Sequence, residues 1–200
     1  MISVYKIKPK FQKSLQPILV ILRKIGVSPN QITIFTILFS FIIGYFLING
    51  IENKIWFLFV SLGLLVRMAL NALDGMMAKK YNLQSTKGEI LNEIGDIISD
   101  VAIYFPFIYF DSINIEYVII FIVLSIINEF CGILSKSIYG ERRYDGPMGK
   151  SDRALLVGLI CIALYFTDTI LTYLDNIFLI GSFLMIISSY FRLTKSNRNE

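Results

Sequence analysis

Six apolar stretches of roughly membrane-spanning length restrict this chain to very few folds. They are Ile32–Ile48, Ile55–Ala78, Ile90–Phe110, Ile115–Ser137, Ala154–Phe166 and Ile177–Leu193. A helix needs about 20 apolar residues to cross the hydrocarbon core of a bilayer. Helices also satisfy their own backbone hydrogen bonds, which lipid cannot do. The sequence therefore predicts an all-α polytopic membrane protein with six transmembrane helices.

Composition supports this interpretation. Hydrophobic residues make up 55% of the 200 residues, and the mean hydropathy is +0.65, which is too apolar for an ordinary soluble domain of this length. No linker rich in Pro, Gly or Ser divides the chain, so we predict one domain over residues 1–200. The chain has no histidine, which excludes histidine-based catalysis and histidine-bound metals. Cys131 and Cys161 lie in apolar runs and are interpreted as packing residues.

Positive charges alternate from one loop to the next and predict the orientation. The cation-rich segments are the N-terminal region, the loops after the second and fourth stretches, and the C-terminal tail, while the opposite loops contain one cation, Lys54. Cytoplasmic loops of membrane proteins are enriched in Lys and Arg. We therefore expect both termini and the site described below on the cytoplasmic face of an inner or plasma membrane. An odd number of spans would break this alternation.

The first 28 residues differ from the rest of the chain. Within residues 5–24, Leu15, Ile18, Leu19 and Leu22 recur at helical spacing among Lys and Gln. This pattern is typical of an amphipathic helix lying in the membrane interface. We predict such an interfacial segment over residues 1–28, with the first span starting near Pro29. The N-terminal region has no cleavage pattern of a removable signal peptide.

Polar residues interrupt the second and third stretches. Asn71 and Asp74 lie three residues apart and share one helix face, while Asn92, Asp96 and Asp100 lie four apart and form one stripe. Charged residues inside a membrane are costly and usually functional. Oxygen ligands of this kind suit Mg²⁺, Mn²⁺ or Ca²⁺. A structural polar network, or a pathway for protons or ions, is an alternative explanation.

The spacing of these residues resembles a family signature. The run Asn71-x2-Asp74-Gly75-x2-Ala78-Lys79-x8-Gly88-x3-Asn92-x3-Asp96 is similar to the pattern D-x2-D-G-x2-A-R-x8-G-x3-D-x3-D of the CDP-alcohol phosphatidyltransferases. The signature spans 26 residues within the region 71–100, and every spacing matches. Pro29-Asn30-x2-Thr33 is also similar to a P-N-x-x-T opening common in these enzymes.

The resemblance implies an activity and a set of site residues. Members of the family transfer a phosphoryl-linked group from a CDP-linked donor to an alcohol and release CMP or its analogue. The implied function is transfer of a phosphatidyl group from CDP-diacylglycerol in phospholipid biosynthesis, with Mg²⁺ or Mn²⁺ as cofactor. The implied catalytic base is Asp96, and the implied metal ligands are Asp74 and Asp96 with Asn71 and Asn92. Asp100, which continues the Asn92–Asp96 stripe one turn deeper, is expected to complete the metal ligands, with Glu93 as the alternative. The implied CDP-donor contacts are Asn30, Thr33, Gly75, Lys79, Ser85 and Gly88. A homodimer is also implied, with membrane lipids and no nucleic acid as partners.

Three signature positions depart from the family pattern. Asn71 and Asn92 replace two aspartates, which reduces the four carboxylates of the pattern to two, and Lys79 replaces an arginine. Lysine keeps the charge but loses the bidentate geometry of arginine. The alternatives are a catalytically silent lipid- or nucleotide-binding relative, or an ion or proton transporter. The acceptor alcohol is not identified by the sequence.

Further charged residues lie near the predicted site. Lys150 and Arg153 stand at the start of the fifth stretch, where they suit either a phosphate of the acceptor or donor or the ordinary anchoring of a span. Arg67 shares a face with Asn71 and Asp74, and we predict that it pairs with an acid such as Asp100. Asn128 and Glu129 interrupt the fourth stretch and are assigned no specific role.

Overall fold

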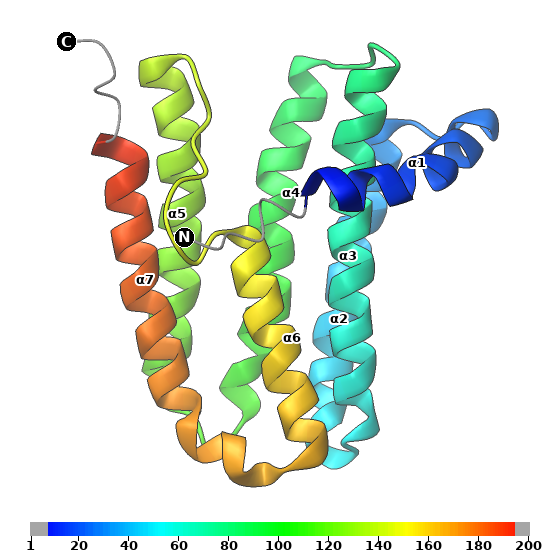
Figure 1. Ribbon diagram of the computed structural model, residues 1–200. Coiled ribbons are helices and arrows are strands. Elements are labelled where there is room, and N and C mark those ends of the chain that lie inside the picture. The colour runs from blue at the N-terminus through cyan, green and yellow to red at the C-terminus, as the bar shows by residue number, and fades with distance from the viewer. Residues whose placement is uncertain (1–7, 195–200) are drawn as a thin grey trace.

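The computed structural model describes residues 8–194, which form a bundle of helices (Figure 1). The helices are α1 (Lys8–Lys24), α2 (Pro29–Glu52), α3 (Ile55–Lys80), α4 (Thr86–Tyr104), η2 (Phe105–Tyr109), α5 (Ile115–Tyr139), α6 (Lys150–Phe166), η3 (Asp168–Tyr173) and α7 (Leu174–Thr194). No β-strand occurs in this part of the chain. The all-α prediction is therefore confirmed.

The bundle has two sides with two helices between them. Figure 1 shows α2 and α3 on one side, α5 and α7 on the other, and α4 and α6 in the middle. Helix α2 packs on α3 and α4, α3 on α6, and α5 on α7. Buried apolar residues from α2 to α7 form one core, and its centre holds the aromatic rings of Tyr104, Phe107, Phe121 and Phe178.

Within the described residues, four helical segments are long and apolar enough to cross a membrane. They are Pro29–Glu52, Ile55–Lys80, Ile115–Tyr139 and Asp168–Thr194. Helix α6 has 17 residues, and the charged residues of α4, from Lys87 to Asp100, lower its hydropathy. Both nevertheless run through the bundle beside the four apolar helices (Figure 1). The fold is thus that of a helical membrane protein, and the count of six spans remains a prediction.

The start of α2 is fixed by a capping box. The Ser28 hydroxyl accepts a hydrogen bond from the Gln31 backbone N–H at 3.3 Å, and Gln31 Oε1 accepts one from the Ser28 N–H at 2.8 Å. These bonds satisfy backbone groups that a helix end otherwise leaves unpaired. Pro29 occupies the first helical position, where its missing N–H costs nothing. As a result Asn30 and Thr33 lie in the first turns of α2.

Helix α1 lies on the outside of the bundle, where it crosses the upper part of α3 and packs on it (Figure 1). Its Leu15 and Leu19 are buried in a second apolar cluster with residues of α2 and α3. Ile18, Ile21 and Ile25 are exposed. The apolar residues of α1 are therefore divided between contact with the bundle and a surface that faces outward.

The loop from 140 to 149 explains why α6 is short. Gly140 ends α5 with a positive φ of 79°. The loop then descends between the helices, so that α6 begins well below the upper ends of α5 and α7 (Figure 1). The loop is held against α7, because the Ser188 hydroxyl donates to the carbonyl of Asp145 at 2.9 Å. A Cβ on Gly146 would lie 2.5 Å from Ser188 Cα, so this contact requires glycine.

Candidate active site

An open cavity of about 1210 Å³ lies at the end of the bundle where α3 turns into α4. It is lined by residues of α1, the start of α2, the end of α3, the start of α4, the end of α5 and the α5–α6 loop. Ligand pockets for drug-sized molecules measure about 300–1,000 Å³. The cavity is therefore large enough for a nucleotide with a second reactant.

Asp74 lines this cavity near the end of α3. Its side chain is buried, and Thr33 of α2 donates a hydrogen bond from its hydroxyl to Asp74 Oδ2 at 3.0 Å. Asp74 also interacts electrostatically with Asp96 and with Lys150. The two signature aspartates come from different helices, and Lys150 interacts electrostatically with both of them.

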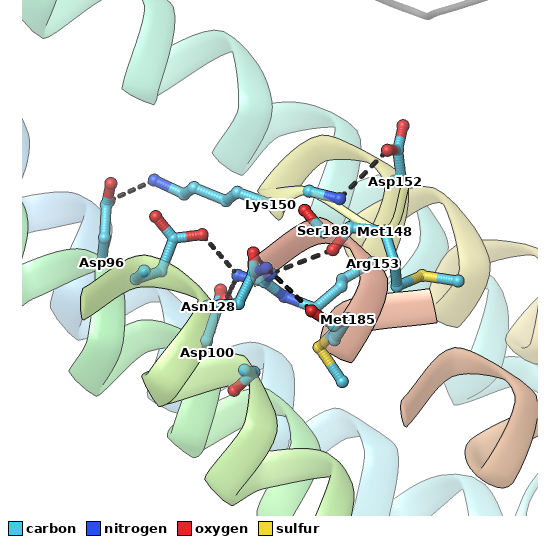
Figure 2. A network of polar contacts seen from close by, with 12 residues as sticks. Asp96, Asp100, Asn128, Met148, Lys150, Asp152, Arg153, Met185 and Ser188 are labelled. Atoms are coloured by element: carbon cyan, nitrogen blue, oxygen red, sulfur yellow. Dashed lines mark hydrogen bonds and ion pairs between the residues drawn. The ribbon is translucent and has the colours of Figure 1, made fainter. Parts of the chain in front are cut away.

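Asp96 lies on α4 and forms an ion pair with Lys150, the first residue of α6 (Figure 2). The carboxylate is buried, and the Lys150 side chain is 23% exposed. The descending loop makes this contact possible, because it starts α6 at the depth of Asp96. A cation thus already compensates the charge of the expected base.

The two signature asparagines stand on the same cavity wall as Asp74. Asn71 lies on α3 and Asn92 on α4, and both line the cavity. A Cβ built on Gly75 would meet no atom within 4 Å, so the backbone of α3 is open to a ligand there. Asp74 and the two amide groups therefore line the cavity where α3 turns into α4, whereas Asp96 lies one turn further along α4 and is not one of the lining residues.

All six residues expected to contact the donor line the cavity: Asn30, Thr33, Gly75, Lys79, Ser85 and Gly88. Ser85 caps α4, because its hydroxyl accepts a hydrogen bond from the Gly88 N–H at 3.1 Å. A Cβ on Gly88 would lie 2.8 Å from Asn30 Oδ1, so glycine allows α4 to approach the start of α2 here. The structure therefore brings these residues together, and their contacts with a donor stay a prediction.

Asp100 is held by two arginines. Arg67 donates to its Oδ1 at 2.7 Å, and Arg153 donates to its Oδ2, also at 2.7 Å. The predicted pairing of Arg67 with Asp100 is confirmed. All three side chains are buried, and Figure 2 shows Arg153 between Asp100, Asn128 and the loop. Both carboxylate oxygens are therefore engaged with cations, and the ligand set proposed below omits Asp100.

Glu129, to which the sequence assigned no specific role, forms the centre of a larger network of ion pairs. Its Oε1 accepts a hydrogen bond from Arg153 at 2.9 Å and lies 3.8 Å from Arg192, and its Oε2 accepts one from Arg142 at 3.0 Å. Arg142 also pairs with Glu93 on the cavity wall. The signal in the sequence was an acid inside an apolar span, which needs a buried partner.

Arg142 lies in the loop, outside the helices that span the bundle. Burial acts to lower the pKa of its guanidinium, but Tyr144, Glu93 and Glu129 outweigh that effect, so the pKa lies above its ordinary value. The ring of Tyr144 also stacks near this guanidinium, 4.9 Å from Arg142 Cζ. Arg142 is therefore a fixed positive charge at the cavity wall.

Fold and site together define a helical membrane protein with a large cavity at one end of its bundle, lined by polar signature residues of α3 and α4. Such a site suits the transfer of a phosphorus-linked group. The family model described as CDP-alcohol phosphatidyltransferase matches residues 26–193. The chain belongs to the CDP-alcohol phosphatidyltransferase family, and the resemblance seen in the signature is confirmed.

Known relatives and structures agree with this assignment. Inner membrane protein YnbA of Escherichia coli is 45% identical over 165 residues, which cover 82% of each chain. Archaetidylinositol phosphate synthase of Pyrococcus horikoshii is 33% identical over 100 residues, half of each chain. The crystal structure of Mycobacterium tuberculosis phosphatidylinositol phosphate synthase with CDP-DAG has a TM-score of 0.72 and 18% identity, covering 88% of this chain and 90% of that one. The same enzyme with manganese and citrate also gives 0.72, at 18% identity, over 90% and 87%.

Proposed function

We propose that this protein transfers a phosphatidyl group from CDP-diacylglycerol to the hydroxyl of an alcohol and releases CMP. The observation that carries the proposal is that Asp74, Asn71 and Asn92 line one cavity with the donor-binding signature, while Asp96 pairs with Lys150, which also interacts electrostatically with Asp74. The hydroxyl oxygen attacks the phosphorus that bears the lipid. The bond between that phosphorus and the bridging oxygen breaks, and the electron pair leaves with CMP.

Asp96 is the proposed base and takes the proton of the attacking hydroxyl. Lys150 holds the Asp96 carboxylate in place and compensates its charge in a buried position. Asn30, Thr33, Ser85 and Lys79 surround the part of the cavity proposed for the CDP group. The Lys79 ammonium suits a diphosphate as a point charge.

A divalent ion fits the chemistry of this donor set. Asp74 and Asp96 supply carboxylates, and Asn71 and Asn92 supply amide oxygens, which are the ligands that Mg²⁺ and Mn²⁺ prefer. Across residues 8–194, no three Asp, Glu, His or Cys side chains are grouped to hold a metal. Because two carboxylates stand where the family pattern has four, the set suits one ion better than two. When bound, a divalent ion would offset the charge that develops on the diphosphate.

The test is CMP release from CDP-diacylglycerol by the purified protein, with Mg²⁺, with Mn²⁺ and with a chelator. Asp96→Asn removes the base and should lower the rate at least about 100-fold, within the usual contribution of general base catalysis. Asp111→Asn, at an exposed position between η2 and α5, is the control and should keep the wild-type rate. An unchanged rate in Asp96→Asn would refute the assigned base.

The same experiment decides the alternative of a catalytically silent relative. The two asparagines and the ion pair on Asp96 are the observations that favour it. A silent relative would bind CDP-diacylglycerol but release no CMP under any metal condition. A transporter is disfavoured, because the charged residues concentrate in the half of the bundle that holds the cavity.

We further propose six spans, with both termini and the cavity at the cytoplasmic face, and residues 1–28 at the membrane interface. The alternation of loop charge supports this arrangement. The exposed apolar side chains Ile18, Ile21 and Ile25 of α1 support its contact with lipid. One domain over residues 1–200, with its signature at 71–100, and a homodimer complete the proposal.

A further inference from the structure

We infer that the acceptor is an alcohol without a phosphate group, an uncharged polyol that binds the α5-side wall of the cavity. This inference rests on the proposed function and names the substrate class of the same site. The α5-side wall consists of Glu89 and Glu93 from α4, Lys136 from α5, and Arg142 and Tyr144 from the α5–α6 loop. Lys79 and the other residues proposed for the donor line the same cavity.

Each cation that the structure describes on or beside this wall already has a carboxylate partner. Lys136 pairs with Glu89, Arg142 with Glu93 and Glu129, and Lys150 with Asp96. A phosphate is recognised by cations and N–H groups that have free hydrogen-bonding capacity. Within residues 8–194, Arg142 Nε and Glu93 Oε2 are both buried without a hydrogen-bond partner. A hydroxyl can accept from the first and donate to the second, whereas a phosphate dianion can only accept and would compete with the carboxylates for the remaining N–H groups.

Arg153 cannot serve in their place. Its side chain is fully buried and bonds to Asp100 at 2.7 Å and to Glu129 at 2.9 Å. The Arg153 guanidinium also donates to the carbonyl of Met148 at 3.2 Å (Figure 2). The structure therefore gives Arg153 a packing role, and the phosphate contact expected from the sequence for Lys150 and Arg153 is not part of this inference.

The charges of this region balance before any ligand binds, and the two positive charges of a bound divalent ion would be offset by the two negative charges of the donor diphosphate. Lys136, Arg142 and Lys150 are matched by Glu89, Glu93 and Asp96. A phosphate dianion would add negative charge beside these three carboxylates, in a site partly shielded from water, where like charges repel strongly. An uncharged polyol leaves every ion pair intact, which favours it as the acceptor.

Glu93 supplies the attractive contact. Its Oε1 pairs with Arg142, whereas its Oε2 is buried and finds no hydrogen-bond partner within residues 8–194. An unsatisfied buried acceptor costs free energy that a ligand hydroxyl can recover. Glu93 and Asp96 lie three residues apart on α4 and share a face. One hydroxyl of a polyol can therefore donate to Glu93 while a second is presented to Asp96.

The test compares matched pairs of acceptors with CDP-diacylglycerol as donor. The pairs are glycerol with glycerol 3-phosphate, inositol with inositol 1-phosphate, and sorbitol with sorbitol 6-phosphate. CMP release and the mass of the lipid product are measured for each. We expect kcat/KM to favour the unphosphorylated member at least about tenfold in the best pair. Equal rates, or a preference for the phosphorylated member, overturn the inference.

Variants of the wall sharpen the comparison. Glu93→Gln removes one negative charge and frees Arg142, so the preference for the unphosphorylated acceptor should fall at least about tenfold. If the melting temperature shows that this variant does not fold, Glu93→Asp keeps the charge, shortens the side chain and should raise the KM of the polyol. Glu141→Gln, an exposed neighbour in the same loop, is the control and should keep the wild-type preference. A preference unchanged in the folded Glu93 variant overturns the role of Glu93.

The outcomes separate this inference from the proposed function. If CMP is released and the lipid product carries the phosphate of a phosphorylated acceptor, the choice of acceptor is overturned and phosphatidyl transfer remains intact. No CMP release in any arm, including one supplied with a cell extract of water-soluble alcohols, overturns the proposed function and this inference with it.

Discussion

Asp100 illustrates how a single side chain can match a ligand pattern and still be used elsewhere. It continues the stripe of Asn92 and Asp96, which suggested a metal ligand. The structure instead pairs its two oxygens with Arg67 and Arg153, deep in the bundle. A buried carboxylate is tolerated when its charge and lone pairs are satisfied, and this arrangement satisfies both.

Asp100→Asn should therefore destabilise the protein. The substitution preserves shape but leaves two buried guanidinium groups facing a neutral amide, which costs roughly 3–5 kcal/mol for a broken buried pair. The measurement is thermal unfolding in detergent. Asp168→Asn is the control, because its ion pair with Lys54 is exposed and worth about 1 kcal/mol or less. Equal melting temperatures for the two variants would contradict the structural role.

Some individual contacts were predictable from the sequence and others were not. Arg67 shares a helix face with the signature, so its pairing with Asp100 followed from helical spacing. The ion pair between Asp96 and Lys150 joins residues 54 positions apart. It depends on how far the loop before α6 descends, which no local pattern encodes. The partners of Glu129 could not be predicted either, because they also depend on the course of this loop and on the packing of α6 and α7.

Among the helices, α1 and α6 differ most from their sequence pattern. The apolar residues of α1 suggested one continuous face toward lipid, but Leu15 and Leu19 pack on the bundle while Ile18 and Ile21 remain exposed. Helix α6 begins at Lys150, earlier than the apolar stretch at Ala154, because its first turn is polar and shielded by the neighbouring helices. The periodicity of apolar residues predicts that a helix is amphipathic. It does not predict which apolar residues pack on another helix and which face lipid.

The division of α1 predicts unequal effects of two similar substitutions. Leu19→Ala removes a fully buried side chain between α1 and α3 and should cost about 2–5 kcal/mol. Ile21→Ala, at a position that is 60% exposed, should cost about 0.5 kcal/mol or less. Thermal unfolding of both variants in the same detergent provides the comparison. A larger loss for Ile21→Ala would mean that α1 docks on the bundle through its other face.

In the molecule as a whole, the predicted helical bundle is confirmed, and its apolar exterior agrees with a lipid environment. Large apolar side chains such as Phe35, Leu62, Ile119 and Phe183 are exposed on four different helices. The sequence predicted this exterior from hydropathy alone. It could not predict the arrangement of helices in space, because apolar residues that face lipid and those that face another helix are chemically alike.

The six-span topology predicts a fixed pattern of surface labelling in intact cells. Single cysteines are placed at Lys87, Asp111, Glu141 and Asp168 in a background with Cys131 and Cys161 replaced by alanine. A membrane-impermeant maleimide should label the cysteines at 111 and 168, and those at 87 and 141 should react only after the membrane is opened. Labelling of 87 and 111 from the same side would show that α4 does not cross the bilayer.

The network around Glu129 has an evolutionary consequence. It links α4, α5, α6, α7 and the loop through Arg142, Arg153 and Arg192, and it extends to the cavity wall at Glu93. Replacing one charged residue of this network leaves its partner as an unpaired charge in a nonpolar interior. A descendant with a new acceptor would therefore have to exchange oppositely charged residues in pairs, so diversification should proceed by coordinated double substitutions rather than by single steps.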